Sequence, residues 1–195
     1  LTWYGIPVSR TIALVSPPQE VSGGNRVTAA RWAAIFRDLD WEVSEETTWS
    51  GRLCDVLVAL HARRSHDSIV RFADAHPGRP RIVAASGTDV YGDSPVSAEA
   101  RDSFSRATRI VVLQPRAIER LPAVTRGRAR VVHQSVALPG RRPPKAEDAF
   151  QVCAMAHLRP VKDPLLPARA ARLLPASSRI RIVHVGGLID ESLRP

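Results

Sequence analysis

The stretch Arg81-Ile-Val-Ala-Ala-Ser-Gly-Thr-Asp-Val-Tyr91 decides the fold, because an apolar run of strand length opens directly into a small polar loop. Two other segments have the same form. The run at 12–15 precedes Ser22-Gly-Gly-Asn-Arg26, and the run at 56–60 precedes His61-Ala-Arg-Arg-Ser65. Loops that follow parallel strands gather at one edge of an open α/β sheet, where ligands bind. The three loops together therefore predict one site for an anionic small molecule.

Strand-length apolar runs and helical patterns alternate along the chain between residues 11 and 138. Alternation of this kind is typical of βαβ units that share a parallel sheet. The sequence therefore predicts an α/β fold with a Rossmann-like N-terminal domain at 11–138. Strands are expected at 11–16, 54–60, 81–85, 109–113 and 130–133, and helices at 26–39, 67–75, 98–107 and 115–121.

A proline-rich segment, Pro139-Gly-Arg-Arg-Pro-Pro144, interrupts this alternation and indicates a linker at 139–149. A second Rossmann-like unit is expected at 150–195. One such unit cannot cover both faces of a parallel sheet, so we expect this chain to hold only the start of that domain. Residues 1–10 fit no periodic pattern and are expected to form an N-terminal extension. Within the second unit we expect strands at 150–155 and 180–185 and a helix at 164–174.

The formal net charge of +9 favours anionic partners, and only two of the 28 basic residues are lysines, Lys145 and Lys162. Richness in arginine is also typical of GC-rich genomes, so the charge alone does not indicate nucleic acid. A module that binds nucleic acid would show a basic stripe with interleaved aromatic residues. Aromatic residues make up only 5% of this chain and its arginines are spread along the whole length, so no nucleic-acid partner is expected.

No apolar stretch reaches the roughly 20 residues that a membrane helix needs, and the N-terminus lacks the pattern of a signal peptide. We therefore expect a cytoplasmic protein with no membrane partner. Cys54 and Cys153 each lie in an apolar run, which predicts two buried thiols, with a disulfide between them as the alternative. No spacing of cysteine and histidine indicates a metal site. The sequence leaves the oligomeric state open.

The loops of the first domain carry the residues that we expect to bind an anion. Glycine lets backbone N–H groups approach a phosphate, although the spacing matches neither a dinucleotide fingerprint nor a P-loop. Arginine forks bind oxyanions, and histidine or aspartate can act as a base. The plainer interpretations are a βα turn, a solvated basic loop and an aspartate cap. The expected acceptor-binding residues are Gly23, Gly24, Asn25, Arg26, Arg63, Arg64, Ser65, Thr88, Gln134 and Ser135, and the candidate catalytic bases are His61 and Asp89.

A basic loop, His157-Leu-Arg-Pro-Val-Lys-Asp-Pro164, opens the helix expected in the second unit. Arg159 and Lys162 are three residues apart near a helix N-terminus, a pattern that favours binding of a diphosphate. The plainer interpretation is a helix start with proline near its first position.

The glycine-rich first loop, the G-T-D loop, the linker and the basic loop of the second unit together resemble the two-domain nucleotide-sugar glycosyltransferases of the GT-B fold, family 4 type. That family carries G-R-L-x-x-x-K-G where this chain has Ala156-His-Leu-Arg-Pro-Val-Lys-Asp163. Lys162 matches the family lysine that binds donor phosphate. His157 stands where the family has arginine, and Arg159 follows two residues later as its substitute. The resemblance thus implies a donor-phosphate site made of these three residues.

Five segments resemble a narrower group, the selenosugar synthases of selenoneine biosynthesis. The resemblance implies a reaction that joins selenophosphate to the anomeric carbon of a UDP-sugar, UDP-N-acetylglucosamine or UDP-glucose, to give a selenosugar. It implies no metal, no redox cofactor, an interdomain cleft that excludes water, and a paired-glutamate donor motif further C-terminal than Pro195. Lys162 and Arg159 would stabilise the leaving UDP. The five segments are Gly24–Thr28, Leu57–Ser65, Gly87–Tyr91, Val112–Pro115 and His157–Pro164.

Three other functions remain open at this point. A family 4 glycosyltransferase with a hydroxyl acceptor would need His61 or Asp89 to remove the hydroxyl proton. A basic module that binds nucleic acid would lose affinity steeply with salt. A nicotinamide-dependent oxidoreductase would need the G-x-G-x-x-G fingerprint, which the first loop lacks.

Overall fold

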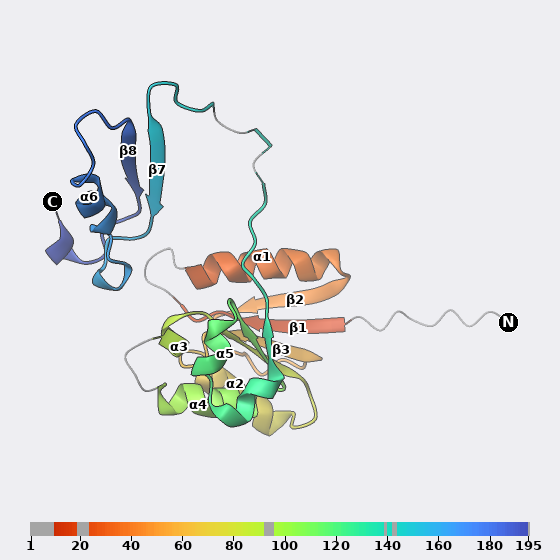
Figure 1. The fold of residues 1–195 in the computed structure, drawn as a ribbon. Coiled ribbons are helices and arrows are strands. Elements are labelled where there is room, and N and C mark those ends of the chain that lie inside the picture. The colour runs from red at the N-terminus through yellow and green to blue at the C-terminus, as the bar shows by residue number, and fades with distance from the viewer. Residues whose placement is uncertain (1–9, 19–23, 92–95, 139, 142–143, 195) are drawn as a thin grey trace. The chain divides into compact units, whose positions relative to one another are not determined.

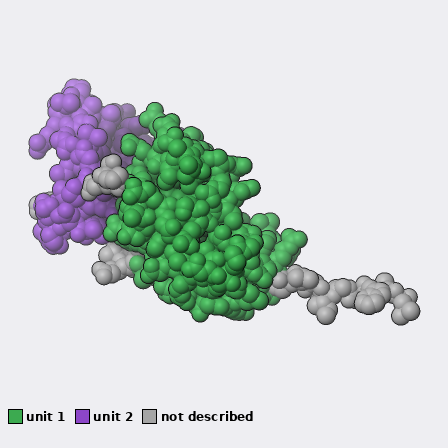
Figure 2. Space-filling model, turned by 90° about the horizontal axis from the view of Figure 1, so that it is seen from below, with its two compact units in different colours: residues 1–137 green, residues 138–195 purple. Residues whose placement is uncertain are grey.

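The computed structural model describes residues 10–18, 24–91, 96–138, 140–141 and 144–194. It consists of two compact units, residues 1–137 and 138–195 (Figure 2). Each unit has its own sheet, six strands in the first and two in the second.

The sheet of the first unit is parallel throughout, as the alternating pattern predicted. Its strand order is β2-β1-β3-β4-β5-β6. The second strand, β2, therefore forms one edge next to β1, and β3 to β6 follow in sequence order to the other edge. The prediction of an α/β, Rossmann-like fold is confirmed for this unit. The strands are β1 (Arg10–Val15), β2 (Trp41–Glu46), β3 (Val56–Leu60), β4 (Arg81–Ala85), β5 (Arg109–Val112) and β6 (Ala129–Val131).

Helices lie on both faces of this sheet (Figure 1). One face packs against α1, which buries Ala29 and Ala33 over β1 and β3. The other face packs against the remaining helices and buries the aromatic side chains of Phe72 and Phe104. The helices are α1 (Gly24–Asp38), α2 (His66–Ala75), α3 (Thr88–Tyr91), α4 (Ala98–Arg106) and α5 (Arg116–Arg120), followed by a 3₁₀ helix at Ala123–Arg128.

In the first unit, one strand and two short helical turns were not predicted from the sequence. The strand β2 has the sequence Trp-Glu-Val-Ser-Glu-Glu and lies at the edge of the sheet, so only one of its sides pairs with a neighbour. Polar and charged side chains are typical of edge strands, because they discourage pairing with other chains. Trp41 and Val43 still pack against the core on the α1 side. The turns α3 and 123–128 are too short to give a periodic pattern.

The second unit holds a parallel pair of strands, β7 (Phe150–Met155) and β8 (Ile180–Val185), at the bounds that the sequence predicted. Its helix α6 (Leu166–Ala171) is shorter than the predicted 164–174. Asp163 has a left-handed backbone with φ of 40°, which separates a 3₁₀ turn at Pro160–Lys162 from α6. A further 3₁₀ turn covers Glu191–Leu193.

The two cysteines lie in different environments. Cys54 is buried in the core of the first unit, and burial raises the pKa of its thiol. Cys153 is exposed, so the prediction that both thiols are buried was wrong for this residue. The reason is that the described part of the second unit has only two strands and one short helix, which leave most residues of β7 open to solvent.

Candidate functional site

The three polar loops follow neighbouring strands β1, β3 and β4 at the carboxyl edge of the sheet. Of the first loop, Gly23 lies outside the described residues, and Gly24 is the first residue of α1. Asn25 is buried against the unit, whereas Arg26 is exposed. The topology therefore places the expected acceptor-binding loops along one edge.

His61 and Thr88 join the loops after β3 and β4. The Nε2 atom of His61 lies 2.9 Å from Oγ1 of Thr88, and the backbone N–H of Arg64 donates to Nδ1 of His61 at 3.3 Å. Since Nδ1 accepts a hydrogen bond, Nε2 carries the proton of the neutral ring and donates it to Thr88. The hydroxyl of Thr88 then accepts from His61, which leaves its own proton to be donated elsewhere. Thr88 is exposed, so that proton faces solvent or a ligand.

Two further features of His61 are characteristic of functional positions. Its backbone φ is 70°, in the left-handed region that few residues other than glycine adopt. The imidazole is buried, and this burial lowers its pKa, although the nearby carboxylate of Asp89 opposes the shift. The ring is therefore held in its neutral form at neutral pH.

Asp89 forms the buried centre of the same loops. Its carboxylate accepts hydrogen bonds from the backbone N–H groups of Ala62, Ser86 and Gly87 at 2.8, 3.0 and 2.9 Å. The distance of 3.9 Å to Nδ1 of His61 is too long for a hydrogen bond. With its oxygens bonded to backbone N–H groups of two loops, Asp89 fixes the shape of the edge. This geometry favours the aspartate-cap interpretation over the role of a base.

Ser65, like Asp89, is hydrogen-bonded within the protein. Its hydroxyl donates to the carbonyl oxygen of Leu60 at 2.7 Å, its backbone N–H donates to the carbonyl oxygen of His61, and the residue is buried. The hydroxyl is thus used inside the turn before α2. That Ser65 also binds the acceptor stays a prediction.

Arg63 and Arg64 are both exposed at the end of β3. Within the described part of the chain, neither guanidinium takes part in a hydrogen bond or an ion pair. Gln134 lies in the segment after β6, and its amide donates to the hydroxyl of Thr28 on α1 at 2.9 Å. Ser135 is exposed in the same segment. Together with Arg26, these two arginines are the cations of this edge whose guanidinium groups have no partner among the described residues.

A pair of residues that was not predicted extends this edge beyond β4. The side-chain amide of Gln114, which follows β5, donates to the hydroxyl of Tyr91 at the end of α3 at 2.6 Å. The sequence signal was present, because both residues belong to segments that the sequence singles out, Gly87–Tyr91 and Val112–Pro115. Their meeting depends on β4 and β5 being neighbours in the sheet.

In the second unit the basic loop packs against the loop after β8. Nδ1 of His157 accepts from the backbone N–H of Gly187 at 3.0 Å, which leaves Nε2 as the protonated nitrogen of a neutral ring. A side chain on Gly186 would collide with the carbonyl of Ala156, so glycine is required at that position. The loops after the two strands are therefore held together at their carboxyl ends.

Arg159 precedes the 3₁₀ turn and Lys162 ends it, and the backbone N–H of Lys162 donates to the carbonyl oxygen of Arg159 at 3.0 Å. Lys162 is exposed, and Nε of Arg159 is buried without a hydrogen-bond partner among the described residues. Lys162 thus stands on a 3₁₀ turn that precedes α6, where the sequence predicted a loop that opens the helix. The expectation of one site that includes this loop and the first unit stays a prediction.

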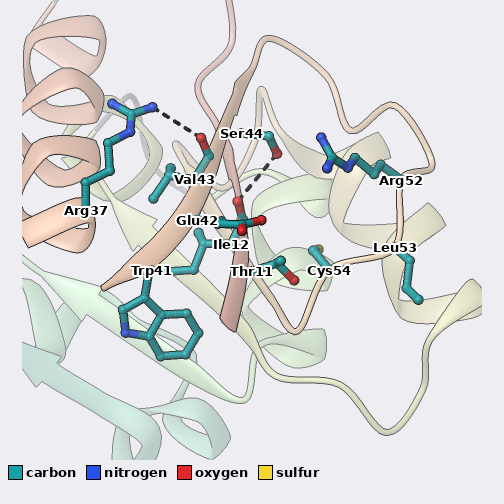
Figure 3. A pocket seen from close by; sticks show the side chains of 10 residues that line it. All are labelled: Thr11, Ile12, Arg37, Trp41, Glu42, Val43, Ser44, Arg52, Leu53 and Cys54. Carbon is teal, nitrogen blue, oxygen red and sulfur yellow. Dashed lines mark hydrogen bonds between the residues drawn. The ribbon is translucent and has the colours of Figure 1, made fainter. Parts of the chain in front are cut away.

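A cavity of about 390 Å³ lies away from these loops, at the amino ends of β1 and β2 (Figure 3). Several of its polar groups are bonded within the protein. Arg37 donates to the carbonyl of Val43 and pairs with Glu45, and Thr11 exchanges hydrogen bonds with Asp55. The side chains of Glu42 and Arg52, which also line the cavity, form no hydrogen bond or ion pair with the described residues. No residue of the expected site lines this cavity.

Comparison with known proteins does not identify the class of this protein. No family model matches the chain, and no curated protein matches it either. Over the described ranges, no helix is both long and apolar enough to cross a membrane. No cluster of three or more histidine, cysteine or acidic side chains in the same ranges could hold a metal ion.

Proposed function

We propose that this protein is a UDP-sugar-dependent glycosyltransferase of the GT-B type that joins selenophosphate to the anomeric carbon of its donor. The observation that carries the proposal is the bonding of the two candidate bases. Asp89 accepts three backbone hydrogen bonds, and His61 accepts one at Nδ1 and donates one from Nε2. Neither is free to remove a proton from a sugar hydroxyl, so an acceptor that is already ionised suits this edge better.

The exposed groups of the edge fit such an acceptor. Arg63 and Arg64 offer guanidinium donors, and Thr88 offers a hydroxyl proton whose direction is set by His61. Charge-assisted hydrogen bonds from arginine to phosphate-like oxygens are among the stronger polar contacts. Selenophosphate presents several anionic oxygens to these donors and keeps selenium as the nucleophile.

In the proposed reaction, a lone pair on selenium forms the bond to the anomeric carbon while the bond from that carbon to the UDP oxygen breaks. The electron pair of the broken bond leaves with UDP, so no oxidant or reductant is consumed. Hydrolysis of the P–Se bond by water then releases phosphate and gives the selenosugar. Lys162 and Arg159, with His157 as a further hydrogen-bond donor, are the proposed donor-phosphate residues. A cation at the diphosphate stabilises the transition state more than the ground state, because negative charge grows on the leaving group.

The direct test supplies the full-length protein with UDP-N-acetylglucosamine or UDP-glucose and compares acceptors. Release of UDP that depends on selenophosphate, together with a product whose mass contains both selenium and the sugar, is the expected result. UDP release that depends on a sugar hydroxyl and not on selenophosphate would support the alternative glycosyltransferase. Retention on DNA that falls steeply with salt, with no turnover of either donor, would overturn the proposal.

The lysines of the chain provide a matched pair for the donor site. We expect Lys162→Ala to lower kcat/KM by about 100-fold, the scale for removing one preorganised charge-stabilising group. Lys162→Arg should recover only part of the rate, because a planar guanidinium does not replace a compact ammonium. Lys145, the other lysine, is exposed and outside the basic loop, so Lys145→Ala is the control and should be unchanged. Equal kinetics for the two alanine variants would remove Lys162 from the mechanism.

A further inference from the structure

A second cavity, of about 400 Å³, opens among α3, α4, α5 and the 3₁₀ helix at 123–128 of the first unit. All of these elements pack on the same face of the sheet (Figure 1). The cavity has the size of small-molecule sites in proteins. Arginines outnumber acids in its lining, with Arg101, Arg120 and Arg126 against Glu119.

The three arginines do not have the same role. Arg126 donates from Nε to the carbonyl of Leu121 at 3.1 Å and from a terminal nitrogen to the carbonyl of Glu119 at 2.7 Å, so it holds the turn between α5 and the 3₁₀ helix. Arg101 and Arg120 are exposed, and in the described ranges no hydrogen bond or ion pair engages either guanidinium. As far as the described residues go, two cations of the lining are thus available to an anion.

The rest of the lining is apolar or aromatic. Val90 and Leu121 are buried and form an apolar wall, and Tyr91 is 46% exposed. The hydroxyl of Tyr91 already accepts from Gln114, so its own proton remains for a ligand. In the cavity at the amino ends of β1 and β2, by comparison, Arg37 donates to the carbonyl of Val43 (Figure 3) and Thr11 is bonded to Asp55, while Arg52 is the lining arginine without a side-chain bond to the described residues.

From these groups we infer that the cavity between α3 and α5 binds a phosphorylated organic molecule of mononucleotide size. The phosphate would be bound by Arg101 and Arg120, and the organic part would lie against Tyr91 and the apolar wall. This site does not depend on the proposed glycosyl transfer. It does share α3 with the candidate acceptor edge, because Thr88 begins that four-residue helix and Tyr91 ends it.

The test titrates the full-length protein with AMP and, separately, with inorganic phosphate at fixed ionic strength in a calorimeter. We expect AMP to bind more tightly than phosphate, since phosphate cannot use the apolar wall. The double variant Arg101→Gln/Arg120→Gln should weaken AMP binding at least about tenfold, because it removes two charged donors. Arg116→Gln is the matched control, as Arg116 is an exposed arginine of α5 that does not line the cavity.

Ala123→Glu is a second variant, which keeps the inference testable if the double variant fails to fold. Ala123 is an exposed residue of the lining, so a carboxylate there should repel the phosphate while leaving the core unchanged. AMP affinity that is the same in the wild type, the double variant and Ala123→Glu would overturn the inference. An equal loss in Arg116→Gln and in the double variant would do the same, because it would show attraction by net charge alone. Binding of phosphate as tight as that of AMP would overturn the assignment to an organic anion.

Discussion

The two edges of the first sheet use arginine in opposite ways. At the amino edge, Arg81 donates to the carbonyl oxygens of Arg106, Pro77 and Arg79, and the guanidinium of Arg128 donates to Phe104 and Ser105 at the end of α4. At the carboxyl edge, Arg26, Arg63 and Arg64 are exposed and form no side-chain hydrogen bond with the described residues.

The difference shows why the number of arginines is a poor guide to the partner of this protein. Helices end at the amino edge with carbonyl groups that have no partner inside the helix, and guanidinium groups satisfy them. Arg79 serves the start of β3 in the same way, through the carbonyl of Cys54 and the carboxylate of Asp55. Much of the positive charge is therefore structural, and the arginines of the carboxyl edge are the candidates for binding.

The largest expected effect concerns the residue that shapes the carboxyl edge. Asp89→Asn places an amide among three backbone N–H donors, and its NH₂ group cannot accept from any of them. We expect the free energy of unfolding to fall by about 3 kcal/mol, as for other broken buried charge networks. Urea unfolding followed by tryptophan fluorescence measures this, because all four tryptophans belong to the first unit.

Asp38→Asn is the control for this prediction, since Asp38 is an exposed residue at the end of α1. It should unfold at the same urea concentration as the wild type. If Asp89→Asn keeps full stability but loses turnover, the residue is a catalytic group and its structural assignment here is wrong.

At the amino edge we expect a smaller loss of stability. Arg81→Ala leaves the carbonyl groups at the ends of α2 and α4 without their donor and should lower the free energy of unfolding by about 2 kcal/mol. Arg81→Lys should restore part of it, because an ammonium can reach some of the same carbonyls. The catalytic constants of the proposed reaction should not change in either variant, and a specific rise of a substrate KM would contradict the structural role.

Arg64→Ala should show the reverse behaviour. The variant keeps the backbone N–H that donates to His61, so stability should stay near that of the wild type. The KM for selenophosphate should rise about tenfold, the scale for one charge-assisted contact, while the KM for the UDP-sugar stays within about twofold. Arg52→Ala, an exposed arginine of the loop before β3, is the control. A larger rise of the UDP-sugar KM would mean that the two substrates bind in the opposite units.

Sequence patterns were sufficient for the strands whose sequences are mostly apolar. The bounds of β4, β7 and β8 agree with the prediction to the residue, although β4 is largely buried whereas β7 and β8 are largely exposed. The edge strand β2 gave no such signal, since only Trp41 and Val43 pack inward among acidic neighbours. An edge strand with only two inward-facing residues gives an apolar pattern that is too short to recognise.

The same limit applies to the candidate site. Strand order brings the three loops to one edge, and this followed from the alternation of strands and helices. The sequence could not show that Asp89 is bonded to backbone N–H groups or that Ser65 closes a turn, because both roles depend on how two loops pack together. The residue type of a polar side chain in a loop is the same whether it binds a ligand or another part of the protein.

The smallest expected effect is a dependence of stability on pH that comes from His61. Burial lowers the pKa of this ring in the folded protein, whereas the unfolded chain has the ordinary value of about 6.5. Below about pH 6.5 the unfolded state therefore binds a proton that the folded state does not, and the free energy of unfolding falls as the pH falls. The loss cannot exceed about 1.4 kcal/mol per pH unit, the limit for one titrating group.

Comparison of His61→Asn with the wild type isolates this contribution. Asparagine tolerates the left-handed backbone of residue 61 and does not titrate, so the variant should lose less stability than the wild type between pH 7.5 and 5.5. The difference between the two slopes is the quantity to measure, because the substitution also removes the hydrogen bond to Thr88 and shifts both curves. Asp55 and Asp102, whose pKa values are lowered, lose their contributions at a more acidic pH and do not interfere. Parallel curves for the two proteins would show that the ring is protonated as easily in the folded state as in the unfolded chain. In that case His61 could serve as a base at the carboxyl edge. The proposal of an acceptor that arrives already ionised would then lose its main support.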